Sequence, residues 1–276
     1  MSWLQLANKT CIVTGAGSGI GAAVAKALSN AQCHVVMADH NADGMENVLQ
    51  EIKSSSLDYS SSFHHVVTCD VGNEKQVRDL IQQADSFAET LTCESGEESP
   101  RVTMLVNCAG ITRDNWISKM AEEEWDDVID VNLKGTYLAC RHFLDQNRVD
   151  RLFPKGNDRS VSSGSIVNIG SIVSERGNLG QVNYAASKGG VLGLTRALAK
   201  EVAIRNVNVN AVIPGFIHSP MSHAVPDHIK ERMIHQISLR RFGDPEEVSN
   251  LVCFLLSPRS SYITGESVTI SGMIGL

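Results

Sequence analysis

Residues 11–29 read CIVTGAGSGIGAAVAKALS, and the order of residue types in this stretch decides the fold. Cys11 to Val13 is a short, apolar, partly β-branched run typical of a buried strand, and residues 22–29 have the composition of a helix. The glycines between them would let the backbone approach a pyrophosphate, which the free N–H groups and positive dipole end of the helix would bind. The stretch therefore predicts a dinucleotide-binding loop, with a flexible glycine turn as the alternative.

Strands and helices are predicted to alternate along the whole chain. We expect further strands at residues 34–38, 63–69, 104–106, 165–169, 207–213 and 267–270, and long helices at 122–146 and 184–204. Alternation of this kind favours a parallel sheet covered by helices on both faces. No linker divides the sequence, so we predict an α/β protein in which residues 1–276 form a single Rossmann domain with a doubly wound, seven-stranded parallel sheet.

A second informative run is Tyr184-Ala185-Ala186-Ser187-Lys188, with Ser171 thirteen residues upstream of the tyrosine. Side chains four apart lie on one face of a helix, so the Lys188 ammonium would lie beside the Tyr184 phenol. A neighbouring cation favours the phenolate and is expected to lower the tyrosine pKa from about 10. Tyr184 would then exchange protons near neutral pH, although helices also place Tyr and Lys four apart by chance.

Composition argues against several classes of function. Hydrophobic residues make up 42% of the chain and charged residues 20%, an ordinary globular balance, and a net charge of −7 does not suggest a nucleic-acid surface. No apolar stretch is long enough to cross a bilayer. The seven cysteines are scattered, which indicates reduced thiols, and the nine histidines are interpreted as surface residues, so no metal site is expected.

Three polar segments are predicted to be surface loops: residues 54–62, 92–101 and 148–163. The third segment is basic. The segment is predicted to be a simple solvated loop. As an alternative, it contacts a partner through its basic side chains, Arg148, Arg151, Lys155 and Arg159.

These motifs together resemble the short-chain dehydrogenase/reductase family over nearly the whole chain. The run from Thr14 to Gly21 is similar to the family's cofactor loop, residues 107–110 (NCAG) to its strand-end motif, and Pro214-Gly215 to its turn. Cys108 stands where the strand-end motif has a second asparagine. The resemblance implies catalytic roles for Asn132, Ser171, Tyr184 and Lys188.

The resemblance also implies a mechanism. Tyr184 as phenolate would take the alcohol proton while hydride passes to the cofactor, and Ser171 would donate a hydrogen bond to the substrate oxygen. Lys188 would hold the ribose hydroxyls, and Asn132 would support a water chain to Lys188. Ser171 and Tyr184 are thus the implied substrate contacts. The implied cofactor contacts are Gly15, Gly17, Ser18, Gly19, Ile20, Gly21, Asp39, His40, Asp70, Val71, Asn107, Ala109, Gly110, Tyr184, Lys188, Pro214, Gly215, Ile217 and Ser219.

Cofactor choice can be argued from Asp39, which ends the second predicted strand eighteen residues after Gly21. An acid in this place bonds the adenosine ribose of NAD, and its charge would repel the 2′-phosphate of NADP. NADP-preferring members of the family often carry a basic residue where this chain has Ser18 or His40. We expect NAD(H) in preference to NADP(H), with a helix cap as the alternative role of Asp39.

Longer runs resemble one branch of the family, the 3-oxoacyl-acyl-carrier-protein reductases and their NAD-preferring mitochondrial relatives that also act on 17β-hydroxysteroids. These runs are residues 108–114, 130–136, 180–188, 214–217, 243–248 and 261–265. The resemblance implies oxidoreduction of 3-hydroxyacyl/3-oxoacyl thioesters and of 17β-hydroxysteroids such as estradiol and testosterone, in fatty acid synthesis and steroid metabolism. It also implies the mitochondrial matrix, with the cytoplasm as the alternative because no presequence is evident before the first strand.

Assembly is expected from the apolar run at 248–256 and the edge strand at 267–270, since a lone edge strand invites pairing with another chain. By resemblance, these elements build a homotetramer or a heterotetramer with a carbonyl reductase subunit. Residues 271–273 (SGM) depart from the family's usual D-G-G and put those subunit contacts in question. Arg205 matches a residue that docks acyl-carrier protein, or else serves as a cation at a helix C-terminus.

A lid over the pocket is expected at residues 219–237, with an apolar side formed by Met221, Val225, Ile229 and Met233. Such a lid suits an acyl chain or a steroid better than a sugar. A different class of function is also open: a weakly catalytic or non-catalytic NAD-binding subunit of a heteromeric reductase. The presence of all four catalytic residues argues against that alternative.

Overall fold

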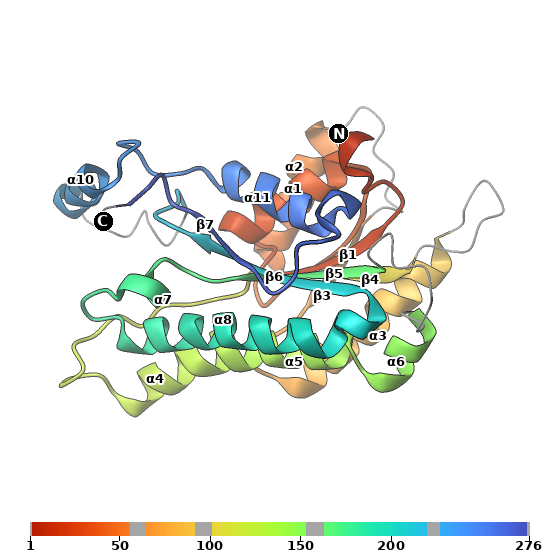
Figure 1. The fold of residues 1–276 in the computed structure, drawn as a ribbon, viewed down its shortest axis with the longest axis horizontal. Helices are drawn as coiled ribbons and strands as arrows, with labels where there is room; N and C mark the ends of the chain where they lie inside the picture. Colours follow the sequence, from red (N-terminus) through yellow and green to blue (C-terminus); the bar gives the residue numbers. More distant parts are fainter. Residues whose placement is uncertain (1, 56–63, 92–100, 153–162, 220–226, 275–276) are drawn as a thin grey trace.

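The computed structural model describes residues 2–55, 64–91, 101–152, 163–219 and 227–274 of the 276-residue chain (Figure 1). A seven-stranded parallel sheet lies at its centre, in the order β3-β2-β1-β4-β5-β6-β7. This confirms the predicted doubly wound α/β class. The strands are β1 (Thr10–Thr14), β2 (His34–Asp39), β3 (His64–Thr68), β4 (Val102–Asn107), β5 (Gly164–Ile169), β6 (Val207–Pro214) and β7 (Ser267–Ile270).

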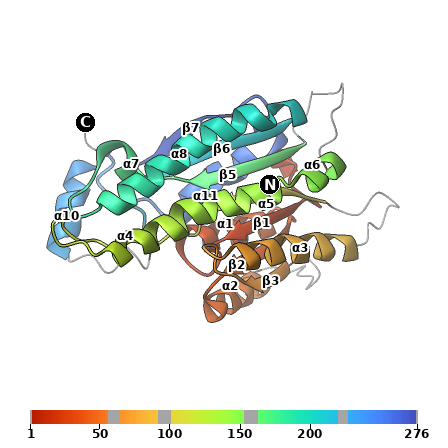
Figure 2. The same cartoon turned by 90° about the horizontal axis from the view of Figure 1, so that it is seen from below.

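Helices cover both faces of the sheet, because successive residues of a buried strand point to opposite sides. Cys11 and Val13 of β1 pack into one hydrophobic cluster, whereas Ile12 packs into the other. The first cluster lies under α1 (Gly19–Asn30), α2 (Ala42–Ser55) and α11 (Pro245–Leu256). The second lies under α3 (Glu74–Thr90), α5 (Gly135–Phe143), α6 (Gln146–Leu152) and α8 (Val182–Val202), most of which Figure 2 shows from below.

The predicted helix at 122–146 is instead three elements. It begins as α4 (Glu122–Ile129), widens into a π-helical turn at Asp130–Lys134, and continues as α5 to Phe143. Gly135 starts α5 against Val71, where a Cβ would meet that side chain at 2.7 Å. Such π-turns concentrate at functional sites, and this one carries Asn132.

The prediction of a surface loop at 148–163 was wrong at its start, because Arg148 lies in α6 and its side chain is buried. Its guanidinium donates to both oxygens of Asp85, to the Phe143 carbonyl at 2.6 Å and to the Val102 carbonyl at 2.8 Å. These bonds draw the residue into the core. Residues 56–63, 92–100 and 153–162 lie outside the described residues, so the loops predicted there stay predictions.

Two histidines also depart from the predicted surface position. His34 and His64 begin the adjacent strands β2 and β3, with His34 buried and His64 half-buried. Burial lowers the pKa of both rings, to about 4 for His64. These side chains therefore belong to the fold at the amino ends of the strands.

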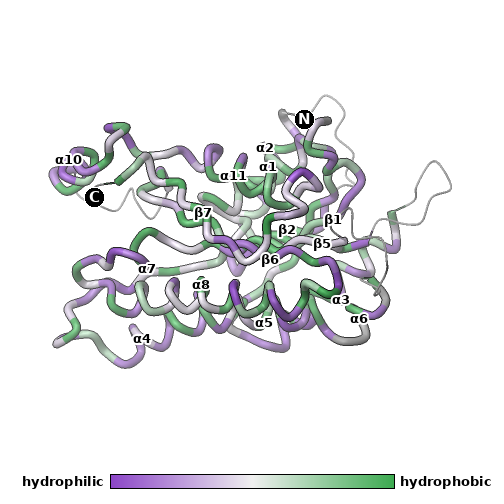
Figure 3. The backbone as a smooth tube through the Cα atoms, in the orientation of Figure 1, coloured by the Kyte–Doolittle hydropathy of each residue, from purple (hydrophilic) through white to green (hydrophobic). Residues whose placement is uncertain are grey.

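The apolar run at 248–256 forms most of α11, which lies beside α1 and is largely hydrophobic in Figure 3. Val248, Val252, Cys253, Leu255 and Leu256 are buried within the chain itself. The run is thus explained by the core, whereas β7 does lie at the edge of the sheet, as predicted.

Candidate active site

The glycine loop between β1 and α1 packs closely against the end of β4. Gly15 has a positive φ of 66°, and a Cβ there would lie 2.7 Å from the Ala109 nitrogen. A Cβ on Gly21 would come within 2.0 Å of the Gly15 carbonyl oxygen. Side chains at these two positions would force the loop open, so the glycines fix its shape.

The start of α1 leaves backbone N–H groups for a ligand. Ser18 is its N-cap residue and, among the residues that the structure describes, makes no side-chain cap bond to the helix. Gly19 and Ile20 follow at the first turn, where uncapped N–H groups and the helix dipole favour an anion. The loop therefore fits the pyrophosphate of a dinucleotide.

Asp39 at the end of β2 lies under this loop. Its Oδ2 accepts a hydrogen bond from the Gly17 nitrogen at 2.9 Å, and its Oδ1 accepts one from the Asn41 nitrogen at 3.0 Å. The Asp39 carboxylate thus bonds the glycine loop and the start of α2 together. Its Oδ1 also lies 3.0 Å from Nδ1 of the exposed His40. That an adenosine ribose meets the loop at these two residues stays a prediction.

The end of β4 forms the opposite wall. Thr14 Oγ1 accepts hydrogen bonds from the Cys108 nitrogen at 3.2 Å and the Ala109 nitrogen at 3.3 Å. The side chain of Asn107, by contrast, donates to Asn168 Oδ1 at 2.8 Å inside the core. The structure therefore brings the Ala109 backbone against the glycine loop, and it directs the Asn107 side chain to the neighbouring strand. Their contacts with a cofactor stay predictions.

Asp70 and Val71 follow β3 on the adenine side of the predicted site. Asp70 accepts a bond from the Gly72 nitrogen at 2.9 Å and donates its own N–H to Gln76 at 2.8 Å. Val71 is buried against Gly135. These contacts give the turn after β3 a fixed shape.

The segment after β6 borders the site on another side. Gly215 donates to the Ile270 carbonyl at 2.9 Å, and the Pro214 carbonyl accepts from Ile172 at 2.9 Å. Ile217 is buried and bridges Gly243. A Cβ on Gly19 would lie 3.6 Å from Ser219 Cβ, which places this segment beside the glycine loop.

Lys188 is buried between the strand ends. Its Nζ donates to the Ile169 carbonyl at 2.9 Å, and a Cβ on Gly110 would lie 3.3 Å from it. Burial lowers the Lys188 pKa to about 8, against a smaller opposing effect of Cys108. The ammonium is thus a poorly solvated cation next to the predicted nicotinamide ribose position.

Tyr184 lies on the same helix, with its ring centre 5.9 Å from Lys188 Nζ. Burial raises the Tyr184 pKa, a hydrogen bond with Ser171 lowers it, and the charge of Asp114 raises it. The prediction that Lys188 would lower this pKa was therefore wrong. Ser171, not Lys188, is the partner that favours the phenolate, and the pair forms a hydrogen-bonded Ser–Tyr centre.

Asn132 holds the π-helical turn to this centre. Its Oδ1 accepts from the Ile111 nitrogen at 2.8 Å, and its Nδ2 donates to the Ile111 carbonyl at 3.0 Å and to Ser187 Oγ at 3.1 Å. Ser187 in turn donates to the Tyr184 carbonyl at 2.8 Å. Sequence reasoning missed Ser187, although its place between Tyr184 and Lys188 was a signal. The water chain through Asn132 stays a prediction.

A clamp that sequence reasoning also missed joins the segment after β4 to the start of α8. Gln181 donates from Nε2 to both oxygens of Asp114, at 3.0 and 2.9 Å. Asn183 donates to the Arg113 and Glu124 carbonyls at 2.9 and 3.0 Å. In the sequence these residues stand out only as parts of longer motifs, because their partners lie some 60 to 70 positions away.

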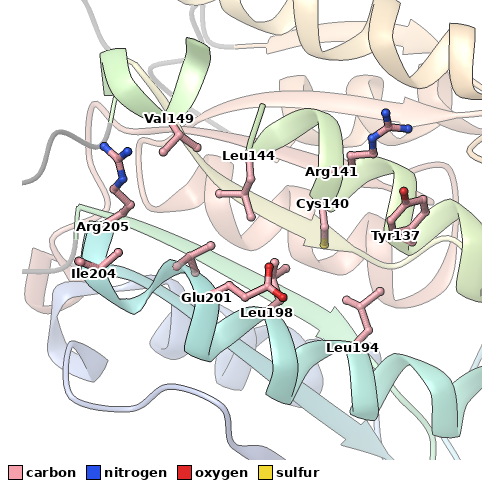
Figure 4. Close-up of a pocket in the computed structure, with 11 residues that line it drawn as sticks. Tyr137, Cys140, Arg141, Leu144, Val149, Leu194, Leu198, Glu201, Ile204 and Arg205 are labelled. Atoms are coloured by element: carbon pink, nitrogen blue, oxygen red, sulfur yellow. The ribbon is translucent and has the colours of Figure 1, made fainter. Parts of the chain in front are cut away.

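A surface hollow of about 370 Å³ lies away from this site, between α5 and α8 (Figure 4). Tyr137 and Leu194 lie at one end, and Arg205 at the other. Arg205 pairs with Asp150 at 2.6 Å. In the part of the chain that the structure describes, no group of three His, Cys, Asp or Glu residues could hold a metal ion, and no helix has the length and apolar character of a membrane span.

Comparison with known proteins agrees with this geometry. Residues 15–272 match the family model described as Enoyl-(Acyl carrier protein) reductase. A 3-oxoacyl-acyl-carrier-protein reductase of Staphylococcus epidermidis is 39% identical over 266 residues, which cover 96% of this chain and 98% of that one. A (3R)-3-hydroxyacyl-CoA dehydrogenase of Mus musculus is 38% identical over 273 residues, which cover 98% of both.

A solved structure shares the fold over almost its whole length. It is a short-chain dehydrogenase/reductase (glucose/ribitol dehydrogenase) from Brucella melitensis, with a TM-score of 0.82, 26% identity and 99% coverage of both chains. The chain therefore belongs to the short-chain dehydrogenase/reductase family of oxidoreductases, which act on CH–OH groups with a nicotinamide cofactor.

Proposed function

We propose that this protein interconverts 3-hydroxyacyl and 3-oxoacyl thioesters with NAD(H), and that 17β-hydroxysteroids are a second substrate class. The observation that carries this proposal is the convergence of Ser171, Tyr184 and Lys188 at the carboxyl end of β5, at the same edge of the parallel sheet as the glycine loop that follows β1. The names of the bacterial reductase and the mouse dehydrogenase support the acyl substrate.

The chemistry follows from the protein groups. The bound nicotinamide cofactor supplies or accepts hydride. Tyr184 exchanges the proton of the substrate oxygen, and Ser171 donates a hydrogen bond to the same oxygen. Lys188 offers its Nζ to the ribose hydroxyls and adds positive charge to the site. Asn132 acts as a positioning residue, because its amide fixes the π-helical turn against Ile111 and Ser187.

The preference for NAD rests on Asp39. A carboxylate has about four acceptor positions, more than the bonds from Gly17 and Asn41 and the contact with His40 occupy, and ribose hydroxyls can donate to the remainder. The 2′-phosphate of NADP would instead place its negative charge at hydrogen-bond distance from the Asp39 carboxylate, and the two like charges would repel each other.

An apolar wall beside the Ser–Tyr centre favours an acyl chain or a steroid. One buried apolar cluster contains Ile172 and Val173. The partly buried side chains that pack against it include Tyr184, Phe216, and Met233 and Ile234 of α10 (Asp227–Gln236). Ile229 and Met233 are half-buried, in keeping with the proposed lid, while Met221 and Val225 lie outside the described residues.

We further propose a tetramer, either of identical chains or with a carbonyl reductase subunit, in the mitochondrial matrix. The support for assembly is β7, whose four residues are half-buried or exposed at the sheet edge. Arg205 beside the hollow of Figure 4 supports an acyl-carrier protein as a partner. Light scattering tests the tetramer, and a monomer alone would contradict it; organelle fractionation tests the location.

The decisive experiment uses the purified chain alone. A 3-hydroxybutyryl thioester, estradiol and glucose are each supplied with NAD or NADP, and reduced nicotinamide is followed by absorbance. We expect turnover of the thioester and the steroid, faster with NAD. Strong turnover of glucose with none of the other two would contradict the proposal. Turnover that appears only after a partner subunit is added would favour the non-catalytic subunit.

A further inference from the structure

The segment after β4 is fixed against the first turn of α8 at three points. The Asn115 nitrogen donates to the Gly180 carbonyl at 2.9 Å, and Asn183 holds the Arg113 carbonyl. Between these bonds, Gln181 Nε2 holds both carboxylate oxygens of Asp114. Gln181 is the N-cap residue of α8 and lies one turn before Tyr184, so the Asp114 charge is held close to the reacting phenol.

We propose that Asp114 is a positioning and specificity residue: its negative charge, fixed by Gln181, opposes a second negative charge at the reacting centre. That second charge is either on the Tyr184 oxygen or on a carboxylate of the substrate. The part concerning substrates rests on the proposed function, because it concerns the group two carbons from the reacting carbon of a 3-hydroxyacyl compound. A thioester is neutral there, whereas a free 3-hydroxy acid is not.

Charge and geometry agree at Tyr184. The charge of Asp114 raises the Tyr184 pKa, in addition to the larger effect of burial. Several other charged groups on the elements around Tyr184 have hydrogen-bond or ion-pair partners of their own. Arg113 pairs with Asp127, Glu124 accepts from Asn115 and Ala121, Arg176 donates to the Ile274 carbonyl, Lys188 donates to the Ile169 carbonyl, and the His235 carbonyl accepts from Arg240.

The first test separates charge from shape with Asp114→Asn. An asparagine keeps an oxygen to accept from Gln181 but removes the charge. Tyr184 should then lose its proton at lower pH, so the rising limb of the pH profile for alcohol oxidation should move down by about half a unit, the scale of one exposed charge. Gln181→Ala keeps the charge but frees it, and should raise KM while moving the limb less.

The control is Asp79→Asn, which removes an exposed carboxylate from α3, a helix that lies apart from α7 and the start of α8 in Figure 2. Its limb should match that of the wild type. An unmoved limb in Asp114→Asn, or an equal movement in Asp79→Asn, would overturn the proposal. Phenolate absorbance, taken as each protein minus its Tyr184→Phe version, gives the same titration without turnover.

The second test compares 3-hydroxybutyrate with its methyl ester. The ratio of kcat/KM for acid over ester should rise about fivefold in Asp114→Asn, and more at low salt, where one charge is less screened. No rise would overturn the specificity claim. If the wild type oxidises none of the acid, the ester and the 3-hydroxybutyryl thioester, the proposed function fails, while the phenolate titration still decides whether Asp114 acts on Tyr184.

Discussion

Two buried cations, Lys188 and Arg148, bind backbone carbonyls at opposite ends of the same sheet. Lys188 donates to the last residue of β5 at 2.9 Å, and Arg148 donates to the first residue of β4 at 2.8 Å. Arg148 is also held by both oxygens of Asp85. Burial lowers the Lys188 pKa to about 8, so keeping this side chain charged costs free energy. The packing of the fold does not explain why a charge is kept there.

The difference shows that one end of the sheet serves stability and the other end serves chemistry. At the amino ends of the strands a paired guanidinium closes the core between α3, β4 and α6. At the carboxyl ends a poorly solvated ammonium lies beside Ser171 and Tyr184, in the crevice where ligands of open α/β sheets bind. Perturbed titrating groups of this kind gather at functional sites.

The largest expected effect comes from Lys188→Met. Turnover should fall at least about 100-fold, the scale on which positioned catalytic groups act, and KM for NAD should rise. The melting temperature should stay level or rise, because an apolar side chain replaces a buried charge of similar length. Steady-state kinetics and calorimetry on one preparation measure both. A fall in stability that matches the fall in activity would remove the contrast with Arg148.

Arg148→Met should show the reverse pattern. Removing one partner of a buried ion pair costs roughly 3 kcal/mol of unfolding free energy, since Asp85 loses its buried guanidinium partner. Activity per folded molecule should remain. Arg141→Met, whose ion pair with Glu74 is exposed, is the matched control and should cost less than about 1 kcal/mol. Equal losses in urea unfolding of the two variants would show that Arg148 is not a buried anchor.

Asp39→Ala tests the preference for NAD over NADP, and we expect a smaller effect than for the two buried cations. Relief of one charge repulsion should raise the NADP over NAD ratio of kcat/KM by about tenfold. The ratio cancels any general loss caused by the broken bonds to Gly17 and Asn41. A wild type that already prefers NADP would show that the interpretation of Asp39 is wrong.

The smallest expected effect is on the pH dependence of stability, through His64 at the amino end of β3. His64 has a folded pKa of about 4, below the ordinary 6.5, so the unfolded chain takes up the proton first as pH falls. Stability is therefore full above about pH 6.5 and is lost as pH falls toward about 4. In His64→Gln the melting temperature should depend less on pH over that window. If it falls with pH as steeply as in the wild type, His64 does not contribute to the pH dependence of stability.

Most of the fold could be predicted because glycines, apolar strands and helix patterns are local signals. The Ser171, Tyr184 and Lys188 set could be predicted for the same reason, since its spacing follows one helix and one strand end. The broken helix at 122–146 could not, because its π-turn depends on the Asn132 bond to Ile111, 21 residues away. Burial of Arg148 depends on Asp85, 63 residues away, which a basic surface pattern conceals.

The electrostatics were harder still. The sequence pattern predicts a lowered pKa for Tyr184 from its neighbour Lys188, yet the structure raises it through burial and Asp114. Neither burial nor the position of Asp114 can be derived from the spacing of Tyr and Lys, because both depend on packing between distant segments.

The most direct test of the account is a comparison of Tyr184→Phe with Tyr137→Phe. Each removes one phenolic hydroxyl, but Tyr137 is exposed on α5, beside the hollow of Figure 4. Oxidation of a 3-hydroxyacyl thioester by the purified chain with NAD should fall at least about 100-fold in Tyr184→Phe, with NAD binding retained, and stay near wild type in Tyr137→Phe. Near-normal turnover in Tyr184→Phe would contradict proton exchange at the carboxyl ends of the strands.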